Sequence, residues 1–172
     1  MSNFEKNLEQ ALNNAKRLTD KILIDGKLIS AQTNNKIPVL NPSTGDNIGS
    51  APQCDKNDVN IAVESAYKAF QKWKKIPARE RGKMVAAGAK RLEERKSEIE
   101  TLLSLDTGNA LRTQAIPETA ASIELTNMFA GLSGELKGEN YPTNIPNSIH
   151  YTTRDPIGVV CAIVPWNAPL FL

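Results

Sequence analysis

The feature that most constrains this 172-residue chain is a continuous apolar run near its carboxyl end. Residues 158–164 read Gly-Val-Val-Cys-Ala-Ile-Val and contain no charged side chain. A strand that is buried on both faces reads in this way, although a buried helix segment of similar length gives the same pattern. The shortness of the run and the flanking Gly158 and Pro165 favour a strand. We expect the strand to end at Pro165, which has no backbone N–H to offer a neighbouring strand.

The two residues after this proline, Trp166 and Asn167, lie just beyond the carboxyl end of the predicted strand. In open α/β sheets, ligands bind in the crevice outside these strand ends, because the loops there line a space that the strands do not fill. The pattern therefore indicates a ligand site at Trp166-Asn167. The alternative is that Asn167 only caps a turn before Ala168-Pro169.

The first fifty residues predict a short helix followed by small antiparallel elements. Apolar residues three or four apart between Phe4 and Leu18 favour an amphipathic helix, with a frayed extension as the alternative. Residues 21–30 predict a hairpin around Asp25-Gly26, and residues 36–40 are expected to continue that sheet. Residues 41–45 form a turn by composition, and their single glycine without a following Lys-Ser/Thr pair does not make a phosphate-binding loop.

Three longer helices are expected in the middle of the chain. Asp55 is the predicted N-cap of the first, Pro77 starts the second, and Gly108 ends it. The polar stretch 91–98 predicts an exposed, ion-paired surface or a kink. A third helix is expected over residues 118–136, with glycines that allow close packing. The apolar positions that define these helices are Val59, Ala62, Val63, Ala66, Phe70, Trp73, Met84, Val85, Gly88, Leu92, Ile99, Leu102, Leu103, Ala121, Ile123, Leu125, Met128, Phe129 and Leu132.

The end of the chain predicts a second hairpin and an unfinished sheet. Residues 138–146 are expected to form a loop, and 149–153 a strand that pairs with 157–160 across the turn 154–156. Helices followed by a hairpin and one buried strand give an α/β or α+β chain.

Charge and apolar patterning exclude several classes of protein. Twenty-one basic and nineteen acidic residues are interleaved and leave a formal charge of +2, so no nucleic-acid or anionic-membrane surface is indicated. No apolar run is long enough to span a bilayer, and the first residues lack the apolar core of a signal peptide. The expected location is the cytoplasm.

The cysteines and the histidine do not predict a catalytic or metal centre. Cys161 lies mid-strand, where an apolar environment makes a thiol inert, and Cys54 precedes a helix start beside Asp55, whose charge opposes thiolate formation. Both are expected to be free thiols. His150 is the only histidine, and we expect its side chain at a surface or interface. No metal site follows from these residues.

Several segments in order resemble the amino-terminal portion of NAD(P)-dependent aldehyde dehydrogenases. The strongest is Pro165-Trp166-Asn167-Ala168-Pro169, which is similar to the motif after that family's first nucleotide-binding strand. The other similar segments are Ile24-Asp25-Gly26, Asn41-Pro42-Ser43-Thr44-Gly45, the region from Trp73 to Arg81, and the stretch from Arg154 to Val160. The resemblance runs from about Ile22 to Leu172.

The resemblance assigns roles to five residues. It implies that Asn167 is the catalytic side chain of the oxyanion hole, a role that suits a neutral amide with two N–H donors. It also implies that Ile163, Val164, Pro165 and Trp166 bind the ribose and nicotinamide side of NAD or NADP. No GxGxxG fingerprint is present, so cofactor binding rests on the resemblance alone. Many relatives carry an aromatic residue where this chain has Ala168, which implies a substrate tunnel of different shape.

The resemblance also implies an incomplete α/β fold in four parts. Residues 1–20 are an amino-terminal helix or extension, and 21–138 are the helical part of the cofactor-binding domain with its leading hairpin. Residues 139–160 resemble the family's oligomerisation arm, and 161–172 its first nucleotide-binding strand and oxyanion loop. The nucleophilic cysteine, the general-base glutamate and much of the cofactor site are expected downstream of Leu172.

Two functional hypotheses follow. The first is part of an oxidoreductase that oxidises an aldehyde to a carboxylic acid with NAD(P)+ through a cysteine thiohemiacetal, with this chain inactive alone. The second is a non-catalytic interaction or oligomerisation module. The expected partners are a small aldehyde and either further copies of the chain or an intact relative, with no nucleic acid or membrane.

Overall fold

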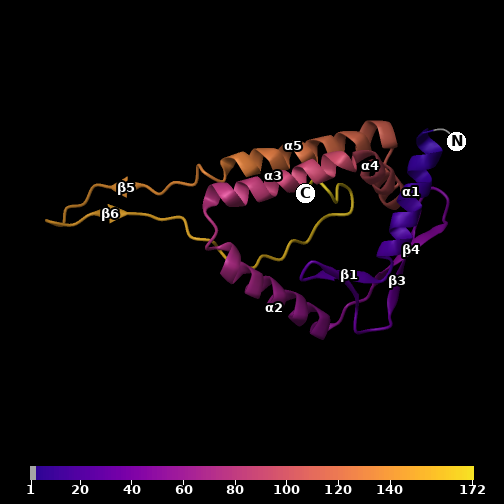
Figure 1. The fold of residues 1–172 in the computed structure, drawn as a ribbon, viewed down its shortest axis with the longest axis horizontal. Coiled ribbons are helices and arrows are strands. Elements are labelled where there is room, and N and C mark those ends of the chain that lie inside the picture. Colours follow the sequence, from indigo (N-terminus) through magenta and orange to yellow (C-terminus); the bar gives the residue numbers. More distant parts are fainter. Residues whose placement is uncertain (1–2) are drawn as a thin grey trace.

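The structure is a computed structural model that describes residues 3–172, and it confirms a mixed helix-and-strand chain. Figure 1 shows helices α3, α4 and α5 together, α1 across their end, and a long arm that projects away from them. The elements in order are α1 (Asn3–Leu18), β1 (Lys21–Ile24), β2 (Lys27–Ser30), β3 (Lys36–Leu40), β4 (Asn47–Pro52), α2 (Lys56–Trp73), α3 (Ala78–Glu94), α4 (Lys96–Thr107), the π-helical turn η1 (Leu111–Ala115), α5 (Ile116–Leu132), β5 (Asn140–Tyr141) and β6 (His150–Tyr151).

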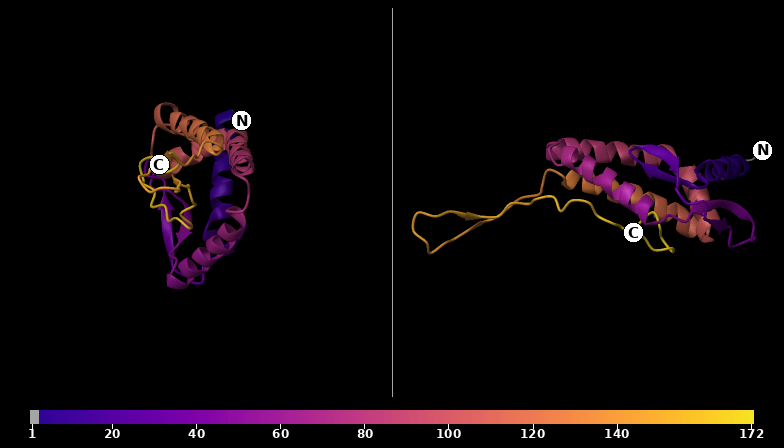
Figure 2. Two further views of the ribbon diagram at one scale, coloured as in Figure 1. Left: turned by 90° about the vertical axis from the view of Figure 1, so that its left-hand side faces the viewer. Right: turned by 90° about the horizontal axis from the view of Figure 1, so that it is seen from below.

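The main helix contact joins α3 to α5, which run side by side in all views (Figures 1 and 2). Gly82 of α3 allows this approach: an added Cβ would lie 2.5 Å from the Ala130 carbonyl oxygen and closer still to Ser133 Oγ. Ala89 and Ala130 are buried in the same interface. The prediction that the glycines of residues 118–136 allow close packing is wrong, because the close approach is at Gly82. A Cβ on Gly131 would meet no atom within 4 Å, and one on Gly134 would meet only the Arg79 side chain at 3.4 Å.

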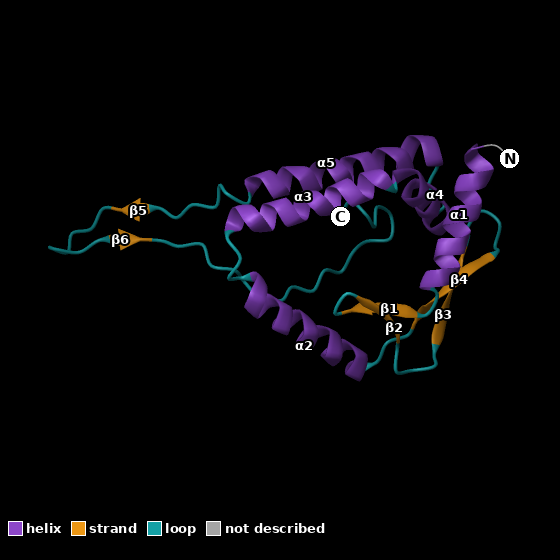
Figure 3. Ribbon diagram, in the orientation of Figure 1, coloured by secondary structure: helices purple, strands orange, loops and turns teal. Residues whose placement is uncertain are grey.

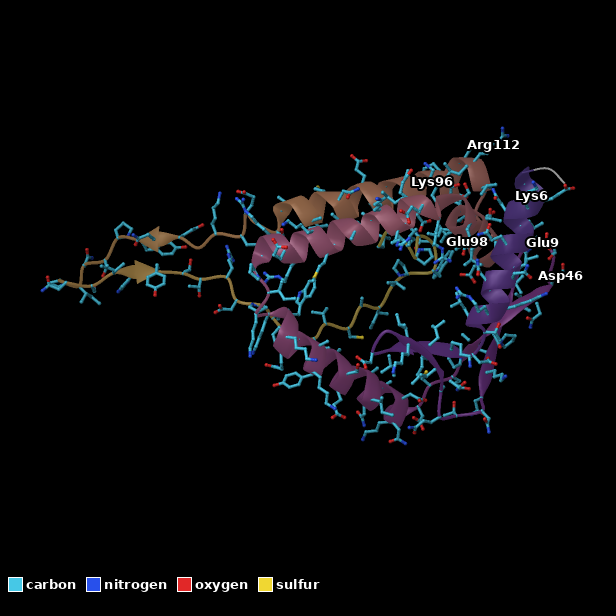
Figure 4. All side chains as sticks on the ribbon, viewed as in Figure 1. Lys6, Glu9, Asp46, Lys96, Glu98 and Arg112 are labelled. Atoms are coloured by element: carbon cyan, nitrogen blue, oxygen red, sulfur yellow. The ribbon has the colours of Figure 1, made fainter. Side chains whose placement is uncertain are left out.

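A polar contact joins α1 to α4 next to the buried Ala11. Asn14 Nδ2 donates to Glu98 Oε1 at 2.8 Å, and the Arg95 guanidinium donates to both oxygens of the same carboxylate. Figure 4 shows Glu98 where α4 faces α1. Because Glu98 is only 7% exposed, these hydrogen bonds satisfy a carboxylate that would otherwise be costly to bury.

The predicted N-cap at Asp55 and the predicted stop at Gly108 are confirmed, whereas the third helix ends at Leu132 and not at residue 136. Asp55 caps α2 by accepting hydrogen bonds from the backbone N–H groups of Asn57 and Asp58, and the Asp58 carboxylate accepts from the Asp55 N–H. Gly108 ends α4 with φ +74°. The chain kinks at Arg95, between α3 and α4, and the predicted ion pairs flank this kink: Arg91–Glu94 at 2.8 Å and Lys96–Glu93 at 2.6 Å.

The strands form three separate antiparallel pairs, so two pairing predictions are wrong. The hairpin at Asp25-Gly26 is confirmed, but β3 pairs with β4 and does not extend β1–β2. The reason is the turn at residues 41–45: Gly45 N donates to Asn41 O at 2.8 Å and Asn41 N to Asp46 O at 2.8 Å, which reverses the chain at once.

The strand β6 pairs with β5 and not with residues 157–160. Thr152 N donates to Glu139 O at 2.8 Å, which extends the β5–β6 ladder toward the base of the arm. Asp155 precedes Pro156, and a residue before proline favours an extended backbone, so the chain continues instead of reversing at 154–156.

Residues 158–164, the predicted buried strand, carry no strand in the structure. The segment runs as a loop alongside α2 (Figure 3), and none of the strands in residues 3–172 pairs with it. Its side chains are consequently exposed, with Ile163 at 94%. The apolar run is a strand sequence without a neighbouring strand to provide a ladder or cover its faces.

Candidate functional site

The residues after Pro165 form a single helical turn. The Ala168 carbonyl oxygen accepts hydrogen bonds from the N–H groups of Phe171 and Leu172, both at 3.2 Å. Pro169 occupies the first position of this turn, where its fixed φ is favourable and its missing N–H costs nothing. Asn167 therefore stands immediately before the residue that begins the turn.

The turn is capped by a side chain from another element. Ala168 has no side-chain acceptor, and the free N–H of Leu170 instead donates to Glu118 Oε1 at 2.9 Å. Glu118 is half-buried and lies in the first turn of α5. Capping, the alternative role for Asn167, is thus provided by Glu118.

A second contact holds the backbone of Asn167. Asn109 Nδ2 donates to the Asn167 carbonyl oxygen at 3.0 Å. Asn109 is itself fixed just after α4, because its N–H donates to Thr107 Oγ1 at 3.1 Å and its carbonyl accepts from Ser104 Oγ at 2.8 Å.

The side chain of Asn167 is exposed and makes no hydrogen bond to any residue between 3 and 172. Its two N–H donors are therefore available to a ligand, while its backbone is held by Asn109. A neutral amide in this arrangement can donate to a carbonyl oxygen that becomes negatively charged, and it needs no change of protonation to do so.

The structure places Ile163, Val164, Pro165 and Trp166 in the extended segment that leads to this turn. Pro165 is half-buried, whereas Ile163 and Trp166 are 94% and 85% exposed. Exposed apolar and aromatic faces fit contact with the rings of a nicotinamide cofactor. These four side chains carry no charge that could pair with a pyrophosphate.

Glu118 and Asn109 were not identified from the sequence. They lie 52 and 58 residues from their hydrogen-bond partners in the loop, and an acidic residue in a first helical turn or an asparagine after a helix normally indicates local capping. Only the packing of α4 and α5 brings them to Asn167 and the turn of residues 168–172 that follows it, together called the Asn167 turn.

Neither cysteine forms a catalytic pair in the described part of the chain. Although the Cys54 side chain is exposed, partial desolvation, followed by the Asp58 and Asp55 carboxylates, raises the pKa of its thiol, which disfavours the nucleophilic thiolate. Cys161 is exposed, so the prediction that it packs in a core is wrong; the loop that carries it has no covering element. The His150 ring lies on the arm, with Nε2 3.5 Å from Thr143 Oγ1.

Residues 3–172 lack two further features. They contain no group of three or more His, Cys, Asp or Glu side chains placed to hold a metal ion. None of their helices is both long enough and apolar enough to cross a bilayer. A mainly apolar cavity of about 380 Å³ lies beside the Asn167 turn, bounded by α1, β4, α4, Pro169 and Leu170.

Known proteins are similar to this chain in sequence and in fold. The sequence profile of the aldehyde dehydrogenase family matches residues 28–172. Phenylacetaldehyde dehydrogenase of Pseudomonas fluorescens is 35% identical over 163 residues, which are 91% of this chain and 32% of that protein. Benzaldehyde dehydrogenase, mitochondrial, of Antirrhinum majus is 34% identical over 89% of this chain and 29% of its own length.

Solved structures agree. The HpcC protein from Thermus thermophilus superposes with a TM-score of 0.90 at 27% identity, over 98% of this chain and 32% of that one. Betaine aldehyde dehydrogenase from Staphylococcus aureus, solved with NAD+, superposes with a TM-score of 0.87 at 30% identity, over 95% of this chain and 33% of that one. The chain thus spans about a third of the relatives that it matches. With a profile match over most of its length and the fold to accompany it, the chain belongs to the aldehyde dehydrogenase family.

Proposed function

We propose that this chain supplies the oxyanion-binding segment and one wall of the cofactor site in an enzyme that oxidises an aldehyde to a carboxylic acid with NAD+ or NADP+. The observation that supports this proposal is the Asn167 turn. Its backbone is held by Asn109, its cap comes from Glu118, and the Asn167 amide has no hydrogen bond within residues 3–172.

In the proposed reaction, a cysteine thiolate adds to the aldehyde carbonyl and forms a thiohemiacetal. The N–H donors of Asn167 stabilise the charge that develops on the carbonyl oxygen. Such a donor interacts more strongly with the charged tetrahedral species than with the neutral aldehyde, so it lowers the barrier and does not merely tighten substrate binding.

The side chains of Ile163, Val164, Pro165 and Trp166 would contact the ribose and nicotinamide side of the cofactor. When bound, the oxidised nicotinamide accepts a hydride from the substrate carbon. The contribution of these four residues is an apolar surface that orients the cofactor and excludes water. The NAD+ bound to the Staphylococcus aureus relative supports NAD+ as the oxidant.

The proposal includes inactivity of residues 1–172 alone. Asn167 can stabilise an oxyanion only after a nucleophile has formed one. Cys54, whose thiol pKa is raised, is a poor candidate for that nucleophile. Purified chain should produce no NAD(P)H from a panel of aldehydes, and turnover at a normal enzymatic rate that survives a second purification would contradict this.

The test of the oxyanion role is Asn167→Ala in an active enzyme, made by joining the carboxyl-terminal part of a family member in frame after Leu172. Removal of one oxyanion donor elsewhere costs about a hundred- to a thousand-fold in rate, and the loss here should fall in or just below that range. Asn167→Asp should be slower still, because a carboxylate repels the developing charge. Single-turnover kinetics, with cofactor affinity and melting temperature as controls, measures both. A rate within about threefold of the parent would overturn the role.

A second candidate function, as an interaction module, is favoured by the arm. Ile145, Ile149 and Tyr151 are all mostly exposed on it, and its two strands, β5 and β6, are joined by only two residue pairs. Exposed apolar side chains on a projecting hairpin indicate a surface that another chain covers. In this function the arm joins copies of the chain or an intact relative.

A further inference from the structure

We propose that Glu118 and Asn109 are positioning residues that hold the Asn167 amide in the geometry required for oxyanion stabilisation. The inference rests on the proposed function and names the residues that keep the Asn167 amide in place. Neither residue needs to touch the substrate. They hold the segment 167–170 at its two ends through hydrogen bonds. Asn109 donates to the carbonyl of Asn167, and Glu118 accepts from the N–H of Leu170.

The backbone that carries Glu118 is held in place. The next residue, Thr119, is fully buried, and its hydroxyl donates to the Ala115 carbonyl at 2.9 Å where η1 joins α5. The α5 helix then packs along α3. A carboxylate on so rigid an element can define where the Leu170 N–H lies, and with it where the turn begins.

Asn109 is held equally well. Both of its backbone polar groups are used, one by Thr107 and one by Ser104, so its side chain projects from a fixed point after α4. Its amide nitrogen donates to the Asn167 carbonyl, which accepts no other hydrogen bond from residues 3–172.

Two held ends leave the short segment between them little freedom. Asn167 carries its catalytic donors on a side chain with few rotatable bonds, so the position of its backbone largely decides where the donors point. Misplacement of a reacting group by about 1 Å can cost roughly a hundred-fold in rate, which is why contacts remote from the chemistry can matter. Loss of either hydrogen bond should therefore lower kcat while changing KM little.

The first test uses the 172-residue chain and needs no activity. Amide hydrogen exchange followed by NMR should show at least a tenfold faster rate at Leu170 in Glu118→Ala. In Glu118→Gln, which keeps an acceptor oxygen, the rate should stay within about threefold. Glu124→Ala is the matched control, because Glu124 is an exposed residue of the same helix without a hydrogen bond in the described chain. An unchanged exchange rate at Leu170 in Glu118→Ala would show that Glu118 does not hold this N–H, which would overturn its positioning role.

The second test is a double-mutant comparison in the active enzyme described above. Glu118→Ala and Asn109→Ala should each lower kcat about tenfold or more, with KM within about threefold and partial rescue by Glu118→Gln. In the Asn167→Ala background, both should have almost no further effect on kcat, because they act through Asn167. Asn127→Ala, an exposed position of α5, is the control for Asn109→Ala.

The outcomes separate this inference from the proposed function. If Asn167→Ala alone leaves the rate unchanged, the oxyanion role fails whatever the exchange data show. Suppose that Asn167→Ala lowers kcat but Glu118→Ala and Asn109→Ala do not, or that these two lower kcat by the same factor with Asn167 present and with Asn167→Ala. The positioning role then fails and the oxyanion role stands. Loss of kcat that tracks a fall in melting temperature in both backgrounds would also overturn the positioning role.

Discussion

At the scale of single residues, two glycines of α3 differ in what surrounds them. A Cβ on Gly82 would meet the Ala130 carbonyl of α5, whereas a Cβ on Gly88 would meet no atom within 4 Å. Gly82 therefore permits a helix contact, while Gly88 only costs backbone entropy.

We accordingly expect Gly82→Ala and Gly88→Ala to change stability in opposite directions. Overpacking against backbone typically costs about 1–3 kcal/mol, so Gly82→Ala should lower the free energy of unfolding by that order. Gly88→Ala should raise it by up to about 1 kcal/mol, the helix-propensity difference. Urea denaturation of both variants measures this. Equal stability changes would show that α3 and α5 are not in contact at Gly82.

At the scale of elements, Asp20 links three segments at the end of α1. Its carboxylate accepts from Ser50 Oγ of β4 at 2.5 Å and from the Lys36 ammonium of β3. The hydrogen bond from Lys36, followed by that from Ser50, holds the pKa of Asp20 below its ordinary value of 3.8. The ion pair with Lys36 requires the charged carboxylate, and the charge strengthens the hydrogen bond from Ser50.

The sign of the pH dependence follows from this lowered pKa. Asp20 is more acidic in the folded chain than in the unfolded one, so its stabilising effect is present above about pH 4 and is lost as the pH falls through the lower, folded-state pKa. The stability difference between wild type and Asp20→Asn should therefore shrink below about pH 4. Asp25→Asn is the matched control, because Asp25 also has positive φ and no side-chain hydrogen bond in the described chain. A difference that is constant from pH 6 to 2.5 would contradict the assignment.

Elements whose signals are local could be predicted, and those that depend on a distant partner could not. The capping box at Asp55, the stop at Gly108 and the Asp25-Gly26 hairpin each follow from a few adjacent residues. Strand pairing failed for residues 36–40 and 149–153 because the sequence shows strand character without naming the partner. For the same reason the motif led to Asn167 as a proposed site residue, whereas no local signal led to Glu118, which caps the following turn from a distant helix.

At the scale of the whole molecule, the helical core and the carboxyl-terminal segment differ in how well they are covered. Helices α3, α4 and α5 bury their contacts, but α2 and residues 157–160 leave an open groove between them, lined in part by Ile61, Phe70 and Val159. The segment also offers backbone N–H and C=O groups that no strand pairs. Unpaired edges and contiguous apolar surface both promote association between chains.

We therefore expect the 172-residue chain to self-associate, mainly through this segment. Ile157 and Val160 are 92% and 69% exposed on it, so Ile157→Lys with Val160→Lys should reduce the weight-average mass in sedimentation experiments by placing charge on the contact. The matched pair on the arm, Ile145→Lys with Ile149→Lys, should leave most of the association in place. If the arm pair alone disperses the chain, the arm is the association surface and the interaction-module function gains support. A monodisperse monomer with a sharp, cooperative melt for the unmodified chain would contradict the expectation for both surfaces, because neither would then need a partner to cover its apolar side chains.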